Sequence, residues 1–177
     1  MVNLAGLLKR RGDLAGAEGM FRRALTIREK CLGADHPTTT ATRSALAVVL
    51  RAVGDLAGAE AEFRHVLRAH EARLGLDHPS TSNHLFNLAG VLRRRGDLAG
   101  AEAAFRRALA IRERCLGAEH PDTASTLSGL AGVLEAQGDA AGAAAMAARA
   151  AAIEGAQQAK AAAKAKLAPK RREGSVC

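Results

Sequence analysis

The chain repeats itself every 42 residues, and this period constrains its fold more than any other feature. Gly-Asp recurs at 12–13, 54–55, 96–97 and 138–139, and His-Pro recurs at 36–37, 78–79 and 120–121. Between these markers the copies align without a gap, and residues 10–37 differ from 94–121 at few positions. Because a fixed period of tens of residues is typical of stacked supersecondary units, we expect about four copies of one unit.

Each copy is predicted to form two helices. In the third copy, apolar residues at helical spacing indicate a first helix over 80–95 and a second over about 98–116. Gly96 lies between them, and glycine reaches the left-handed conformation that ends helices without steric cost. Asp97 can then cap the second helix through its carboxylate.

The connections between copies are short. His120 or its neighbour is expected to cap the next helix, and Pro121 fits the first helical position, where its missing N–H costs nothing. With about four linking residues, the helices must pack as antiparallel neighbours. A single helical pair cannot bury its apolar face, so the sequence predicts an all-α solenoid.

The domain boundaries follow from the same markers. We place one array over residues 1–158 and a basic, Ala/Lys-rich helical extension with a disordered tail over 159–177. The four repeats are expected at about 1–36, 37–78, 79–120 and 121–158.

Two repeats depart from the pattern. Met1 falls inside the first helix of the first repeat, which would lack its opening turn, and one explanation is that the chain is a fragment of a longer array. In the fourth repeat, Ala140, Ala147 and Ala151 stand where the third has leucine, phenylalanine and leucine. Alanine keeps helix propensity but gives up apolar burial. We therefore expect residues 140–168 to form a weakly packed, fraying capping helix and 169–177 to be disordered.

Composition excludes several classes of protein. No apolar run approaches the ~20 residues of a membrane span, and the N-terminus has no signal-peptide layout, so we expect a cytoplasmic protein. The chain has four Phe, no Trp and no Tyr, which argues against base or sugar stacking. Of the net charge of +8, residues 160–177 contribute +5 and the remaining 159 residues only +3. The body of the protein is therefore not a predicted nucleic-acid binder.

The repeat resembles the tetratricopeptide signature. In the third copy the residues that carry this resemblance are Leu88, Ala89, Leu92, Ala101, Phe105 and Ala108. The 42-residue period, with the pattern NLAxVLxxxGD…AExxFRRALAIRExxLGxxHP, is similar to the kinesin light chain type of this family. The resemblance implies a right-handed superhelix of helix-turn-helix repeats that serves as a protein-interaction scaffold or cargo adaptor and is not an enzyme.

The resemblance also implies where a partner binds, because first helices line the concave groove of this fold. The groove positions that we expect to contact a partner are Asn3, Lys9, Arg10, Ser44, Arg51, Asn83, Asn87, Arg93 and Arg94. In the family, groove asparagines hold a peptide backbone. Asn3 and Asn87 match that asparagine, whereas Ala45 and Gly129 do not, so the clamp is incomplete.

A basic stripe in the groove would set the chemistry of the ligand. Lys9, Arg51 and Arg93 occupy equivalent positions in three successive repeats, and Glu135 interrupts the stripe at the fourth. Since arginine binds carboxylates bidentately, we expect an acidic or acidic-aromatic peptide as partner. The alternative is that these residues are ordinary solvated charge.

We find no pattern that supports catalysis, a cofactor or a metal site. The His-Pro histidines lie one per repeat, too far apart to converge on one ion, and His65, His70 and His84 are interpreted as isolated surface or interface residues. Cys31 and Cys115 are expected to be buried or half-buried apolar residues that do not pair. The outer-face pairs Glu18/Arg22, Glu60/Arg64 and Glu102/Arg106 are interpreted as i,i+4 helix support.

Two other functions remain open. The basic tail could contact nucleic acid or an anionic membrane, and its PKRR segment at 169–172 could serve in nuclear import. Alternatively, the repeats could stack end to end with other copies through apolar Leu4, Leu7 and Leu8 on the first helix.

Overall fold

The computed structural model describes residues 2–167, with side chains described for residues 2–163. Within this range the chain is all α-helical and contains no strand. The helices are α1 (Val2–Arg10), α2 (Leu14–Leu32), α3 (Pro37–Val53), α4 (Leu56–Leu74), α5 (Pro79–Arg95), α6 (Leu98–Leu116), α7 (Pro121–Ala136) and α8 (Ala140–Leu167). The two helices predicted for each repeat are confirmed; the predicted tail at 169–177 lies outside the described residues.

Local sequence signals set the helix boundaries. Gly96 has φ +84° and ends α5, and Asp97 then accepts a hydrogen bond from the Gly100 N–H at 2.9 Å. His120 caps α7, since its Nδ1 accepts from the Asp122 N–H at 3.1 Å, and Pro121 follows in the first helical position. The predicted caps are thus confirmed, with the histidine itself as the capping residue.

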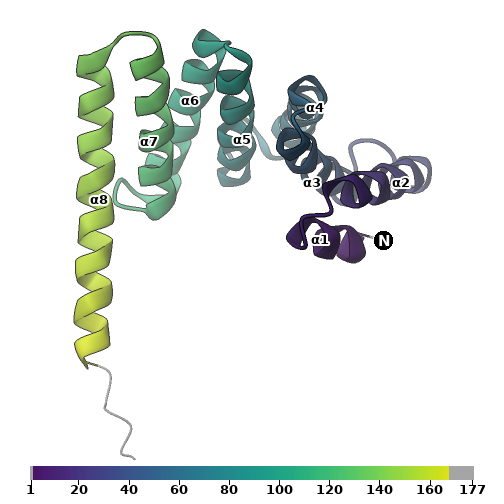
Figure 1. Cartoon of the computed structure of the whole chain (residues 1–177), viewed down its shortest axis with the longest axis horizontal. Coiled ribbons are helices and arrows are strands. Elements are labelled where there is room, and N and C mark those ends of the chain that lie inside the picture. Colours follow the sequence, from purple (N-terminus) through teal and green to yellow (C-terminus); the bar gives the residue numbers. More distant parts are fainter. Residues whose placement is uncertain (1, 168–177) are drawn as a thin grey trace, which may run out of the picture.

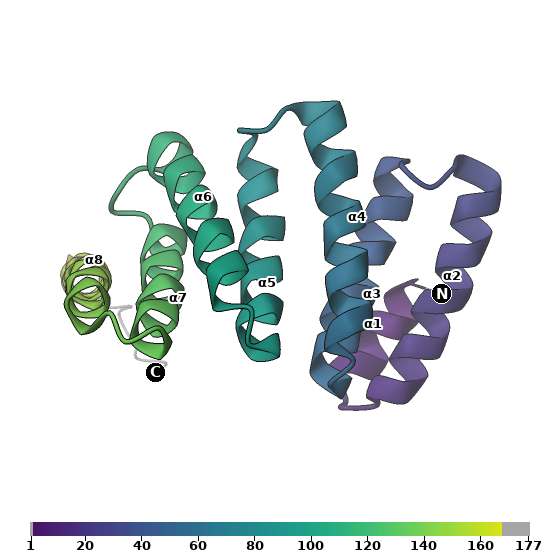
Figure 2. The ribbon, with the colours of Figure 1, turned by 90° about the horizontal axis from the view of Figure 1, so that it is seen from above.

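The four helical pairs stack into a curved solenoid (Figure 1). Each helix packs against the helix before and after it in the chain. The first helices also approach one another closely across repeat boundaries, α3 with α5 and α5 with α7. Second helices reach each other through long side chains, such as the Arg107–Glu71 ion pair between α6 and α4. The face formed by α1, α3, α5 and α7 is therefore the inner one, and Figure 2 shows the pairs succeeding one another along the array.

The core is built from one phenylalanine in each of the first three second helices. Phe21, Phe63 and Phe105 are all buried, together with the predicted leucines, valines and alanines of the first helices. Phe105 reaches the first helix of the next repeat, where a Cβ added to Gly129 would lie only 2.6 Å from the phenylalanine ring. The absence of a side chain at Gly129 is what allows this close approach.

The fourth repeat is loosely packed, as its alanines predict. In the first half of α8 only Ala150 and Ile153 are buried, against Ala124 and Leu127 of α7, and most of the other residues are exposed. Ala147 takes the place of Phe105 but is exposed, because no described helix covers that face of α8. The alanines leave an open hollow of about 300 Å³ between α7 and α8.

We predict that Gly129→Ala lowers the free energy of unfolding by about 1–3 kcal/mol, because the added methyl group must displace the buried Phe105 ring. The matched control is Gly90→Ala in α5, where the nearest atom to an added Cβ is the Arg51 Nη1 at 3.7 Å. That change should stabilise by up to about 1 kcal/mol through helix propensity. Urea unfolding measures both, and equal effects of the two substitutions would contradict this account of the junction.

Candidate functional site

Three arginines gather on the inner face where α3 meets α5 and α5 meets α7. The Arg94 Nη1 donates to the backbone carbonyl of Arg51 at 2.7 Å, and the Arg51 Nη1 lies 3.5 Å from the Asn87 Oδ1. Arg51 and Arg93 each cross to the next repeat, where a glycine leaves room for the side chain. A Cβ added to Gly132 would lie 2.7 Å from the Arg93 Nη1.

The charge of this cluster is not neutralised within the described chain. Arg51, Arg93 and Arg94 form no ion pair with any carboxylate whose side chain is described. Partial burial, and then the nearby positive charge of Arg94, lower the pKa of the Arg51 guanidinium from its usual value. A bound carboxylate would offset both effects, since it would supply hydrogen-bond acceptors and opposite charge.

The asparagines on α5 are partly engaged by the protein itself. The Asn87 Nδ2 donates to the Asn83 backbone carbonyl at 3.0 Å, which fixes the amide beside Arg51. The Asn83 Oδ1 accepts from the Arg112 Nη2 at 2.8 Å. Asn83 is therefore turned toward α6, whereas Asn87 stays with the arginine cluster and keeps one amide hydrogen for a ligand.

The remaining expected groove residues are more dispersed. Asn3, Lys9 and Arg10 are exposed on α1 and border a shallow hollow of about 580 Å³ on that helix. Ser44 is half-buried on α3. The structure thus brings together Arg51, Asn87 and Arg94, places the Arg93 guanidinium at the next junction beside Gly132, and leaves the three α1 residues as a separate group.

Comparison with known proteins identifies the fold. The sequence model of the family described as Tetratricopeptide repeat matches residues 1–72, 39–114 and 80–154. The chain belongs to the tetratricopeptide repeat family. No curated protein sequence matches the chain significantly.

The solved structures with the same fold include proteins from two organisms. BtubC (BKLC) from P. vanneervenii superposes with a TM-score of 0.81 at 23% identity, over 99% of this chain and 67% of that one. A putative kinesin light chain from P. anserina with nearly identical TPR-like repeats has a TM-score of 0.79 at 24% identity, over 87% of this chain and 73% of that one. A single-substitution variant of that second protein gives the same values. The fold of this tetratricopeptide repeat protein is thus of the kinesin light chain-like type.

The outer face of the tetratricopeptide array holds paired charge. The Arg22–Glu18, Arg64–Glu60 and Arg106–Glu102 pairs lie at 2.9, 2.8 and 2.8 Å, so the predicted i,i+4 pairs are confirmed. Other ion pairs join consecutive second helices, including Arg149–Glu113 at 2.6 Å between α8 and α6. Paired outer arginines contrast with the arginines of the groove, which have no described carboxylate partner.

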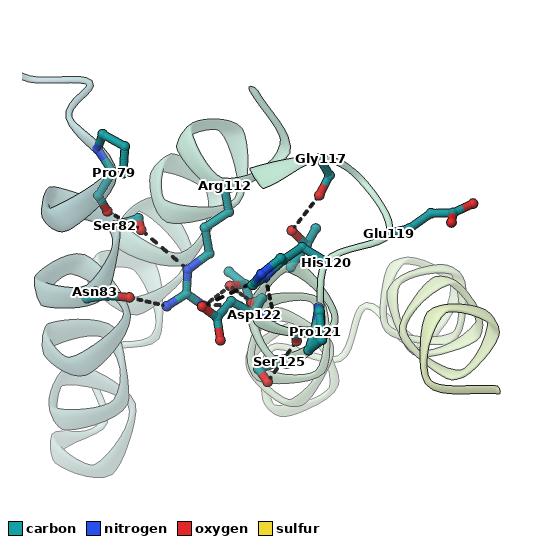
Figure 3. Close-up of polar contacts among 12 residues, drawn as sticks. Pro79, Ser82, Asn83, Arg112, Gly117, Glu119, His120, Pro121, Asp122 and Ser125 are labelled. Atoms are coloured by element: carbon teal, nitrogen blue, oxygen red, sulfur yellow. Dashed lines mark hydrogen bonds and ion pairs between the residues drawn. The ribbon is translucent and has the colours of Figure 1, made fainter. Parts of the chain in front are cut away.

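Sequence reasoning missed Arg112, which joins three helices at the last repeat junction (Figure 3). Its guanidinium donates to the Thr126 Oγ1 at 2.6 Å, the Asp122 carbonyl at 2.7 Å and the Asn83 Oδ1 at 2.8 Å. It also lies 4.9 Å from the centroid of the Phe86 ring. The signal was present, because Arg28 and Thr42 stand at the equivalent positions of an earlier junction, and the Arg28 Nη1 likewise contacts the Thr42 hydroxyl.

Two expectations about single residues were wrong. Cys31 and Cys115 are exposed. The neighbouring Leu32 and Leu116 are also 47% and 41% exposed, so the last turns of α2 and α6 are open to solvent. His65, His70 and His84 are not isolated: the His65 Nε2 lies 3.2 Å from the Asp35 Oδ1, and the rings of His70 and His84 contact each other with centroids 4.4 Å apart.

Two other kinds of feature are missing from the described part of the chain. It includes no helix that is long and apolar enough to cross a membrane. Among the side chains described, no group of three or more His, Cys, Asp and Glu is placed to hold a metal ion.

We predict that Arg112→Met lowers the free energy of unfolding by about 2–3 kcal/mol, because it leaves the buried acceptors around the guanidinium without a donor. Arg28→Met is the matched control. Arg28 is less buried, and its described hydrogen bonds go only to α3, with none to the first helix of its own repeat. Its substitution should therefore lower the free energy of unfolding by less than half as much. Urea unfolding of both variants would reject this account if the losses were equal.

Proposed function

We propose that this protein is a scaffold that binds an acidic peptide segment of another protein in the groove formed by its first helices. The observation that carries the proposal is that Arg51 and Arg94 at the α3–α5 junction, and Arg93 at the α5–α7 junction, have no described carboxylate partner. Several arginines elsewhere in the array, such as Arg43 and Arg107, are bound to glutamates of neighbouring helices. Charge held together without a counter-charge is suited to an anionic ligand.

The geometry favours an extended segment that runs along the array. Arg51 and Arg93 come from successive first helices, so carboxylates in one segment can meet both in turn. Asn87 lies beside Arg51 and offers its free amide hydrogen to a peptide carbonyl. Gly129 offers no asparagine at the next repeat, and the Phe105 ring lies in the space beside it. The peptide is therefore held mainly by α3 and α5.

The proposal extends to the role that this protein has when its partner is bound. Solved structures of the same fold include a putative kinesin light chain and BtubC (BKLC), and we propose that this protein likewise acts as an adaptor, in the cytoplasm and without catalysis. Expected partners are proteins or peptides, and no small-molecule substrate, nucleic acid or cofactor is required.

The first test measures fluorescence anisotropy with labelled acidic and acidic-aromatic peptides. Replacing Arg93 and Arg94 by glutamate should weaken binding at least tenfold, because each charge-assisted hydrogen bond contributes about 1.5–3 kcal/mol. Asn87→Ala should weaken binding by a smaller factor.

The matched control is Arg23→Glu on α2. Arg23 is exposed and forms no ion pair in the described structure, so the substitution changes charge without breaking a described contact, and affinity should stay within about twofold. A chain that ends at Lys160 separates the groove from the basic tail. Binding that survives the groove substitutions but vanishes on truncation would replace the groove with the tail as the binding site, for nucleic acid or an anionic membrane.

A second candidate function is end-to-end stacking of copies. Leu4 and Leu7 of α1 are 48% and 53% exposed, whereas the equivalent Leu46 and Val49 of α3 are buried in the junction between repeats. Leu8 is half-buried and already packs against the core. The exposed pair therefore has the character of a junction surface that could accept another repeat.

If copies stack through this surface, sedimentation velocity should show a mass that rises with concentration. Leu4→Lys combined with Leu7→Lys should return the protein to a monomer, while Leu32→Lys, at an exposed position on α2, should leave the association intact. A monomer at every concentration would remove this candidate and leave the groove proposal unaffected.

A further inference from the structure

The three repeat junctions differ at one pair of equivalent positions. The first junction places Arg28 of α2 against Thr42 of α3, and the third places Arg112 of α6 against Thr126 of α7. Forty-two residues after Arg28 and Thr42 stand His70 of α4 and His84 of α5. The middle junction therefore replaces a cation and a hydroxyl with two imidazoles, and both members of the pair differ together.

The two imidazoles pack against each other without polar partners on their inner nitrogens. The ring centroids lie 4.4 Å apart in an edge-to-face arrangement, with an interplanar angle of 62°. The Nδ1 atoms of both rings are buried and have no hydrogen-bond partner within the described structure. This packing suits two neutral rings, since two charged imidazoliums at this separation would repel each other.

The surroundings of the pair supply positive charge. The positive charges of Arg73 on α4 and of His78 before α5 help to lower the pKa of His70, and that of His70 helps to lower the pKa of His84. The carboxylates nearby in sequence are already bound, Glu71 by Arg107 of α6 at 2.5 Å and Asp77 by Arg114 of α6 at 3.1 Å. A proton on either ring therefore gains no described counter-charge.

The middle junction also carries the arginine cluster. The contacts between Arg51 and Asn87, and between Arg94 and the Arg51 carbonyl, both run from α3 to α5. These contacts therefore hold only while the second and third repeats stay packed, which is the packing that the histidine pair supports.

We propose that the His70–His84 contact makes the junction between the second and third repeats an acid-sensitive hinge, which separates the two halves of the groove when the rings are protonated. The consequence for peptide binding rests on the function proposed above, whereas the opening of the hinge does not. The first and third junctions cannot respond in this way, because Arg28 and Arg112 keep their charge at all relevant pH values.

The pH range in which the hinge opens follows from the pKa shifts of the two histidines. Burial, and then the charge of His70, lower the pKa of His84 to about 4, and burial lowers the pKa of His70. The unfolded chain has a histidine pKa near 6.5, so it binds more protons than the folded junction below that pH. The stability of the junction is therefore complete above about pH 6.5 and is lost progressively as the pH falls toward 4.

The test uses the exposed Cys31 and Cys115, which lie in the first and third repeats on either side of the hinge. In a Cys177→Ser background, spin labels on these two cysteines report the distance between the halves at pH 7.5 and pH 4.5. The proposal expects one narrow distribution at pH 7.5 and a broader or shifted one at pH 4.5. It also expects the melting temperature to fall by about 5 °C between these pH values.

The decisive variant is His70→Arg with His84→Thr, which installs the pair that the other junctions use. It should keep the pH 7.5 distribution at pH 4.5 and abolish most of the pH-dependent loss of melting temperature. His84→Thr alone provides a second variant that should reduce the response. His65→Arg is the matched control. It gives the second repeat the arginine that the third has at the equivalent position, Arg107, and leaves the His70–His84 pair intact. This variant should respond to acid as the unmodified chain does.

Two results would overturn the hinge: an unchanged distance distribution at pH 4.5 in the unmodified chain, or an equal response in the double variant. Peptide affinity is measured separately. A hinge that opens in a protein that binds no acidic peptide would refute the groove function alone, whereas peptide binding with a rigid junction would refute the hinge alone.

Discussion

The array is held together by the packing of each second helix against the first helix of the next repeat. Phe105 lies against Gly129 of the next repeat, and Phe21 and Phe63 at the equivalent positions are likewise buried. Burying one phenylalanine side chain contributes about 1.5–3 kcal/mol. A single helical pair would leave this ring in water. The repeats are therefore stable only together, and each junction matters as much as the helices that it joins.

The same junctions decide how charge is distributed over the protein. First helices approach closely on the inner face, so Arg51 and Arg93 extend over the glycines of the next repeat and meet no described carboxylate. Second helices stand farther apart, and the space between them is bridged by long ion pairs such as Arg107–Glu71. One stacking geometry thus produces an outer face bridged by ion pairs and an inner face on which Arg51, Arg93 and Arg94 have no described carboxylate partner.

Repetition makes the differences between repeats informative. Where Arg28–Thr42 and Arg112–Thr126 fix two junctions by hydrogen bonds, the middle junction relies on the contact between His70 and His84. Equivalent positions in one chain thus act as natural controls for each other. They show which contacts every junction needs, such as the buried phenylalanine, and which contacts one junction has to itself.

The helices, their caps and their buried faces could be predicted from the sequence, because Gly96, Asp97 and His120 act on backbone groups within a few residues. The fold could be predicted as well, because a 42-residue apolar period can be buried only by stacking. The turn of Asn83 toward Arg112 and the contact of His70 with His84 became visible only in the folded array. Those partners lie 29 and 14 residues apart in sequence. Whether they meet depends on how far each side chain reaches across the packed helices, and no local sequence pattern encodes that distance.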